Sequence, residues 1–137
     1  MVTELPVVLL PVGSYRLLMP ASALYRILDQ PRIIRQGSDE GVKAREDFWP
    51  LLTPRFAGAG QFGDAKHANI RVAMVEHEEC RFALRLVGTP ETRYLQQGQL
   101  RSRRNIVPGA LASGAYDWGD ETVLLPSLTA IKQMLQS

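Results

Sequence analysis

The sequence holds a single cysteine, few aromatic residues and no long apolar run. Cys80 is the one cysteine among 137 residues, which excludes an internal disulfide and a multi-cysteine metal site. The longest apolar run, VVLLPV at residues 7–12, is far shorter than the roughly 20 residues that a membrane-spanning helix needs. It also follows Glu4, where a secretory leader would carry basic residues. We therefore expect a cytoplasmic protein with no membrane insertion.

The sequence also lacks a strong charge of either sign and a glycine-rich phosphate-binding motif. A net charge of +2 is too small to demand a polyanionic partner. The glycines at residues 58–63 fit neither GxxxxGK(S/T) nor GxGxxG, so no nucleotide cofactor is indicated. With 45% apolar and 22% charged residues, the 137 positions are typical of a soluble globular protein. We expect a single domain over residues 1–137.

The beginning of the chain predicts a β-hairpin followed by a short helix. Two apolar stretches within residues 7–20 flank a turn at Gly13-Ser14, which is typical of a hairpin. In residues 21–28 the apolar side chains recur at helical spacing. Pro20 suits the first turn of a helix there, and Pro31 would end it.

The rest of the chain predicts mainly strands. Residues 69–75 and 80–87 alternate between apolar and polar side chains, which indicates a hairpin with one face exposed to water. The remaining predictions are a loop or weak strand at 36–46, a strand at 47–52, a surface loop at 57–68, a second hairpin from 109–116 and 122–125, and a closing helix at 127–135 with Ser127 as its N-cap. Many short strands with two short helices favour small barrels or a sandwich.

No set of residues stands out as a catalytic or metal site. His77 lies in an acidic turn at residues 76–79, but turn carboxylates are usually solvated and a metal site needs several convergent ligands. Cys80 follows directly, and a hydrolase built on Cys80 and His77 would need a third group to orient the histidine. A free cysteine is more often a small buried apolar residue. We therefore expect no catalytic residue, no metal and no cofactor.

A basic cluster offers an alternative function. Arg93, Arg101, Arg103 and Arg104 lie close together in sequence and would suit the phosphates of a nucleic acid bound by a small β-barrel. Single-strand binders also need aromatic side chains on which bases stack, and Tyr94 is the one aromatic residue nearby. A solvated or protein-facing basic surface is therefore the preferred interpretation.

Four segments together resemble the CheW-like family, the adaptor domain that couples chemoreceptors to a histidine kinase. They are MPASALYRIL at 19–28, KAREDFWPLLTPR at 43–55, RVAMVEHEECRFALRLVG at 71–88 and GDETVLLPSLTAI at 119–131. The second keeps an arginine, Arg45, and a proline, Pro50, at the spacing of the family's motif. It departs from that motif at Lys43, where the family has asparagine, and at Glu46, where it has glycine.

The resemblance implies both a fold and a function. The implied fold is mainly β, with two small five-stranded SH3-like barrels that share a core and carry short helices. The implied function is that of a non-enzymatic adaptor that couples the cytoplasmic tip of a chemoreceptor to the regulatory domain of a CheA-type histidine kinase, with no small-molecule substrate. The departures from the motif suggest a divergent or accessory adaptor, which would serve a pilus-motility (twitching) chemosensory system.

The same resemblance places the partner-binding residues. They are Leu24, Arg26, Lys43, Arg45 and Glu46. Arg26 stands where the family has a glutamate near the motif arginine, so Arg26 and Arg45 would be neighbouring like charges that select an acidic partner surface. Phe48 and Trp49 should point to opposite faces of one strand, one into the core and the other toward a partner.

Overall fold

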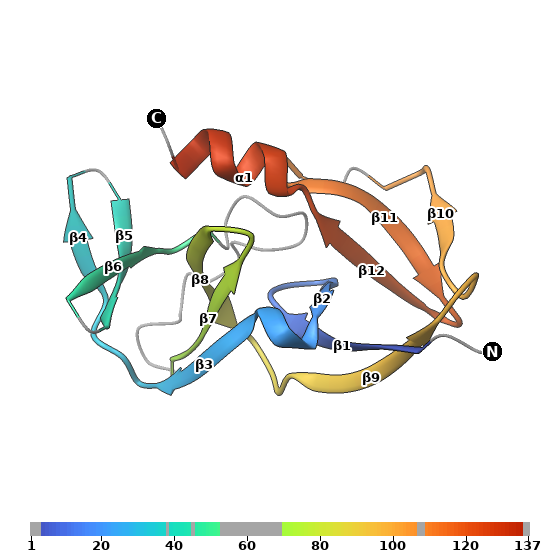
Figure 1. Ribbon diagram of the computed structural model, residues 1–137, viewed down its shortest axis with the longest axis horizontal. Helices are drawn as coiled ribbons and strands as arrows, with labels where there is room; N and C mark the ends of the chain where they lie inside the picture. Colours follow the sequence, from blue (N-terminus) through green and yellow to red (C-terminus); the bar gives the residue numbers. More distant parts are fainter. Residues whose placement is uncertain (1–3, 38, 45, 53–69, 107–108, 136–137) are drawn as a thin grey trace.

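The computed structural model describes residues 4–37, 39–44, 46–52, 70–106 and 109–135, and within them the fold is mainly β (Figure 1). Strands and short helices follow one another as β1 (Glu4–Pro11), β2 (Arg16–Pro20), the 3-10 helix η1 (Ala21–Ala23), β3 (Leu24–Asp29), β4 (Ile34–Gln36), β5 (Asp39–Ala44), β6 (Asp47–Pro50), β7 (Arg71–His77), β8 (Cys80–Leu86), β9 (Glu91–Gln96), β10 (Arg101–Arg103), β11 (Ala112–Trp118), β12 (Glu121–Pro126) and the helix α1 (Leu128–Leu135).

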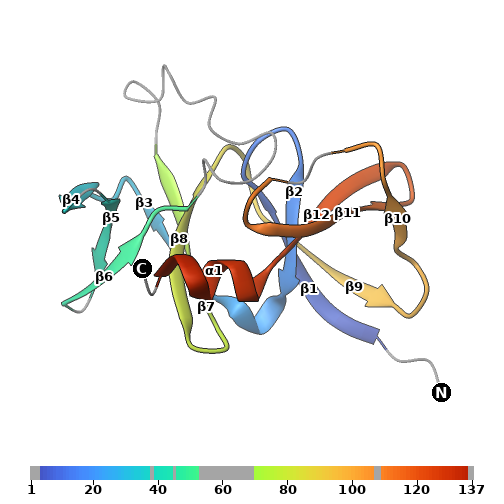
Figure 2. The same cartoon turned by 90° about the horizontal axis from the view of Figure 1, so that it is seen from above.

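These strands form two halves of the molecule that lie side by side. One half is a six-stranded sheet with the order β10-β11-β12-β2-β1-β9, in which the β12–β2 pair is parallel. The other half contains the sheets β3-β7-β8 and β4-β5-β6, which a parallel bridge from Leu51 to Ala83 connects. Each half therefore has six described strands, one more than the resemblance implies. Figure 2 shows α1 across the middle, between the two halves.

A shared apolar core joins the halves. Its members come from β1, β2, η1, β7, β8, β11, β12 and α1, and Phe82 is the largest side chain that is fully buried there. On β1, Val8 and Leu10 face this core, whereas Val7 and Leu9 pack in a second cluster inside the six-stranded sheet. Because β1 is buried on both faces, its apolar run is continuous and does not alternate.

The β7–β8 hairpin is present, but the predicted wet face is wrong. Ala73 and Val75 of β7 belong to the shared core. Val72 and Met74, on the opposite face of the same strand, belong to a third cluster with Val42 and Trp49, which lie on β5 and β6. The strand is therefore covered on both faces. The shared core covers the side of Ala73 and Val75, which the alternation left open, and the β4-β5-β6 sheet covers the side of Val72 and Met74.

The predicted helix at residues 21–28 is also wrong. Only Ala21–Ala23 form a 3-10 turn, and β3 follows directly and pairs with β7. The register with β7 shifts between Leu24 and Arg26, which is typical of a β-bulge. The bulge breaks the strict alternation of side chains, so the half-buried Leu24, Ile27 and Leu28 recur at intervals of three and four. That spacing imitates a helix in the sequence.

The other predicted elements agree with the structure where it describes them. The β1–β2 and β11–β12 hairpins are confirmed, as is α1, whose Ala130 N–H donates a 3.2 Å hydrogen bond to the Ser127 hydroxyl. The polar stretch at 36–46 takes its strand form in β5. Gly41 is required there, since a Cβ atom would lie 2.3 Å from the Trp49 carbonyl oxygen. The predicted loop at 57–68 lies outside the described residues.

Candidate functional site

A polar pocket lies where the two small sheets of the second half meet. Its volume is about 230 Å³. The lining side chains come from five strands, β3, β5, β6, β7 and β8, and they are Tyr25, Arg26, Ala44, Asp47, Trp49, Glu76 and Arg81. We call this hollow the Tyr25–Trp49 pocket. It is a candidate binding site because aromatic, cationic and anionic groups converge on one small cavity.

Two aromatic rings form one wall of the pocket. Tyr25 and Trp49 stack with their ring centroids 5.5 Å apart and an interplanar angle of 22°. Trp49 is buried at 4% exposure, while Tyr25 remains 42% exposed. Trp49 therefore anchors the third cluster, as expected for one face of β6, and Phe48 is half-buried on the other face. The indole Nε1 of Trp49 is buried without a hydrogen-bond partner in the described structure.

Arg81 is held over this wall by two carboxylates. Its Nε donates to Glu76 at 2.5 Å, and its Nη1 donates to Asp47 at 3.2 Å. The guanidinium carbon lies 5.9 Å from the centroid of the Trp49 ring, within the range of a cation–π contact. Since the three side chains are 42–56% exposed, these ion pairs add little to stability, but they hold Arg81 over the indole.

Of the described members of the predicted partner-binding set, the structure places only Arg26 in the pocket lining. Arg26 is exposed there. Leu24, two positions earlier on β3, is half-buried against the shared core. Glu46 is exposed beside Asp47 with a φ of 70°, and Lys43 lines a separate hollow beside Leu28 and Arg32. Arg45 lies outside the described residues, so its predicted closeness to Arg26 stays a prediction.

Sequence reasoning missed Tyr25, Asp47, Glu76 and Arg81 as pocket residues. One signal was available, because the tight turn of the β7–β8 hairpin places Glu76 directly opposite Arg81. Opposite charges at such positions are typical of a cross-strand pair. The contact from Arg81 to Asp47 had no comparable signal, since it joins two sheets.

A second ionic cluster lies on the six-stranded sheet, and its carboxylates pair with part of the basic cluster predicted from the sequence. Arg16 and Arg93 both donate to Oε1 of Glu121, at 2.5 and 2.9 Å, and both also pair with Glu91. Arg93 lies 5.2 Å from the ring centroid of Trp118. Arg103 pairs with Asp117 at 3.1 Å, while Arg101 and Arg104 are exposed. Two of the four arginines that were candidates for phosphate binding are therefore engaged with carboxylates.

Glu91 makes the contribution of this cluster to the stability of the folded state depend on pH. Hydrogen bonds from Arg93 and then Arg16 lower the pKa of Glu91 from 4.5 to about 2. A carboxylate with a lowered pKa stabilises the folded state above its ordinary pKa, and this contribution is lost as the pH falls from 4.5 toward 2. The side chain is 45% exposed, so salt will screen the interaction.

We expect Glu91→Gln to destabilise the protein near neutral pH and to have little effect near pH 2, where the wild-type carboxylate is also losing its charge. Urea unfolding across this pH range, at low and high salt, measures the difference. Glu78→Gln is the control, because Glu78 is exposed and makes no ion pair within the described chain. A difference between wild type and Glu91→Gln that stays constant from neutral to acid pH would contradict the assignment.

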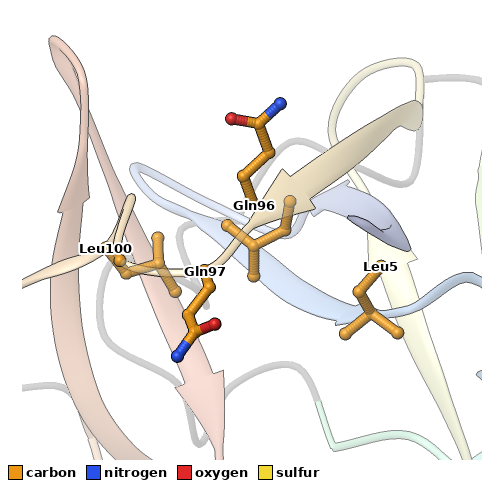
Figure 3. Close-up of a pocket in the computed structure, with 6 residues that line it drawn as sticks. Leu5, Gln96, Gln97 and Leu100 are labelled. Carbon is orange, nitrogen blue, oxygen red and sulfur yellow. The ribbon is translucent and has the colours of Figure 1, made fainter. Parts of the chain in front are cut away.

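An apolar hollow lies on the six-stranded sheet beside the turn between β9 and β10. Its volume is about 340 Å³, and it is lined by Leu5, Leu95 and Leu100 together with Gln96 at the end of β9 and Gln97 in the turn that follows. Figure 3 shows Leu5 and Leu100 on either side of the strand end at Gln96. β9 and β10, which this turn joins, are the two edge strands of the sheet. The hollow is a second candidate contact surface.

The described residues give no support to a hydrolase or a metal site. Cys80 is buried, and this burial raises the pKa of its thiol, which disfavours the nucleophilic thiolate. Among the described residues, no group of three or more His, Cys, Asp or Glu side chains gathers as a metal site requires. No helix in the described part of the chain is long and apolar enough to span a membrane.

Comparison with solved structures identifies the fold. The scaffolding protein TtCheW from Thermoanaerobacter tengcongensis superposes with a TM-score of 0.69, covering 90% of this chain and 89% of that chain. The chain has a CheW-like fold. The sequence identity to TtCheW is 16%, so the likeness is one of structure, and the resemblance read from the sequence is confirmed at the level of the fold. No family model and no curated protein matches the sequence of this chain.

Proposed function

We propose that this chain is a non-enzymatic, cytoplasmic adaptor that couples chemoreceptors to a CheA-type histidine kinase in a bacterial chemosensory system. The observation that carries the proposal is the extent of the match, because TtCheW is a scaffolding protein and the likeness covers nine-tenths of both chains. The raised thiol pKa of Cys80 supports a protein without a nucleophilic cysteine. The partners are the regulatory domain of the kinase and the cytoplasmic tip of the receptor.

Within this proposal, the partner surface comprises Leu24, Arg26, Lys43, Arg45 and Glu46. Arg26 is the member of the set that is most available to a partner, because it is exposed at the rim of the Tyr25–Trp49 pocket and pairs with no carboxylate of the described chain. An exposed cation of this kind favours an acidic partner surface and disfavours a basic one. A pilus-motility role stays a prediction, which a gene deletion tests by comparing twitching with swimming.

Reversing the charge of Arg26 tests the surface. We expect Arg26→Glu to weaken binding to one of the two partners by about tenfold or more, since a like-charge contact in an interface costs over 1 kcal/mol. Calorimetric titration with a kinase regulatory domain and with a receptor-tip fragment from the same organism measures the affinities. Arg104→Glu is the matched control, because it reverses an exposed arginine on the other half of the molecule.

Two results would count against these proposals, and they differ. If wild type binds both partners and Arg26→Glu binds them equally well, the surface is wrong but the adaptor function stands. If wild type binds neither partner, the adaptor function itself is wrong.

A further inference from the structure

The charges that line the Tyr25–Trp49 pocket balance. Two arginines, Arg26 and Arg81, face two carboxylates, Asp47 and Glu76. Both carboxylates already engage Arg81. A ligand carboxylate that entered the pocket would meet two other carboxylates, and a ligand ammonium group would meet two guanidinium groups. The balance leaves no net attraction inside the pocket to offset the cost of dehydrating a charged ligand of either sign, while Arg26 at the rim still favours an acidic partner surface outside it.

The same lining offers hydrogen-bond donors and acceptors to a neutral polar ligand. Arg26 presents a guanidinium with no ion pair in the described chain, and Asp47 and Glu76 leave lone pairs open, with side chains 56% and 42% exposed. A planar amide matches this arrangement, because it carries an acceptor oxygen and a donor N–H₂ in one flat group.

Trp49 supplies an independent reason for a ligand with an acceptor. Its indole Nε1 is buried without a partner in the described structure, although a buried unpaired donor costs about 1–3 kcal/mol. Trp49 is itself part of the pocket lining, so a carbonyl oxygen that reaches the indole N–H from the pocket would satisfy this donor.

We propose that the Tyr25–Trp49 pocket binds a side-chain carboxamide, that of a glutamine or asparagine presented by a partner protein. The amide carbonyl accepts from the Trp49 indole and from Arg26, and the amide N–H₂ donates to Asp47 or Glu76. The aliphatic stem of the ligand packs on the exposed face of Tyr25. Assigning the amide to a partner protein rests on the proposed adaptor function, whereas the ligand chemistry of the pocket does not.

A fragment titration tests the ligand chemistry with this chain alone. Butyramide, butyrate and n-butylammonium share one aliphatic stem and differ in the polar group. Two-dimensional ¹H–¹⁵N NMR follows the indole signals of the two tryptophans, Trp49 and Trp118, which a Trp118→Phe variant assigns. Butyramide is expected to move the Trp49 indole proton downfield and to bind about tenfold more tightly than either charged fragment, a difference of about 1.4 kcal/mol. The Trp118 signal is expected to stay in place.

Two tyrosine variants control for weak binding elsewhere on the surface. Tyr25→Ala removes the exposed wall of the pocket and is expected to lower the butyramide affinity at least about fivefold. Tyr94→Ala removes a tyrosine that is 63% exposed on β9 and should leave the affinity unchanged. The proposal is overturned if butyramide leaves Trp49 unmoved, if a charged fragment binds as well, or if both variants behave alike. Because no partner is present, such a failure leaves the adaptor function to its own binding assay.

Discussion

Replacing Phe82 with alanine is expected to lower the free energy of unfolding by about 3–5 kcal/mol. Phe82 is fully buried and is the largest side chain of the core that both halves share. Its removal leaves a cavity in the core between the two halves, and neither half can close the cavity alone. The loss is a large fraction of the stability of a domain of this size.

Urea unfolding measures this loss of stability. ¹⁹F NMR of fluorotryptophan-labelled protein tests whether both halves of the molecule are destabilised together. Trp118 reports on the six-stranded sheet and Trp49 on the other half, so the two signals follow the halves separately. We expect both signals to change at one lower urea concentration in Phe82→Ala, as a single domain requires. The control is Phe48→Ala, whose half-buried ring should cost about 1–2 kcal/mol. A loss below that of the control, or two separate transitions, would contradict a shared core.

Replacing Trp49 with alanine is the second change with a large expected effect. Trp49 is 4% exposed and packs with Val42, Val72, Met74 and Ala83, so truncation should cost about 3–5 kcal/mol. It also removes the surface on which Tyr25 stacks and over which Arg81 lies. Binding of butyramide should be lost in any Trp49→Ala protein that remains folded.

Trp49→Phe separates packing from hydrogen bonding. Phenylalanine keeps an apolar ring and removes the indole N–H, which has no partner in the described structure. We therefore expect less than half of the destabilisation of Trp49→Ala, measured by urea unfolding. If Trp49→Phe destabilises the free protein as much as Trp49→Ala, the indole N–H already has a partner, and the reasoning from an unpaired donor is wrong.

Local sequence patterns predicted most of the strands. They failed where packing against a distant segment determines the secondary structure or the burial of a strand. The β11–β12 hairpin and α1 depend on a tight turn and on a capping serine, both of which are visible in the sequence. The 21–28 segment follows a helical pattern because a bulge against β7 breaks the strand alternation. The wet face expected on β7 is covered by the shared core, and nothing within residues 69–87 indicates the strands β1, β2, β11 and β12 and the helix α1 that complete this core.

The candidate site could be predicted only in part for the same reason. Arg26 was predicted as a binding residue from its place in a segment that resembles the CheW-like family, and in the structure it lines the pocket. Tyr25 lies beside it in sequence but gains its role from stacking on Trp49, 24 positions later. Arg81 gains its role from Asp47, which belongs to another sheet. Such contacts depend on how the two sheets pack, and single-sequence periodicity does not carry that information.

Sedimentation velocity on a three-component mixture tests the central claim most directly. The mixture contains this chain, a kinase regulatory domain and a receptor-tip fragment from the same organism. An adaptor that couples receptor to kinase should yield one boundary that sediments faster than either two-component mixture and contains all three proteins. If this chain sediments at the same rate alone and in the presence of both partners, the chain has the CheW-like fold without the adaptor function.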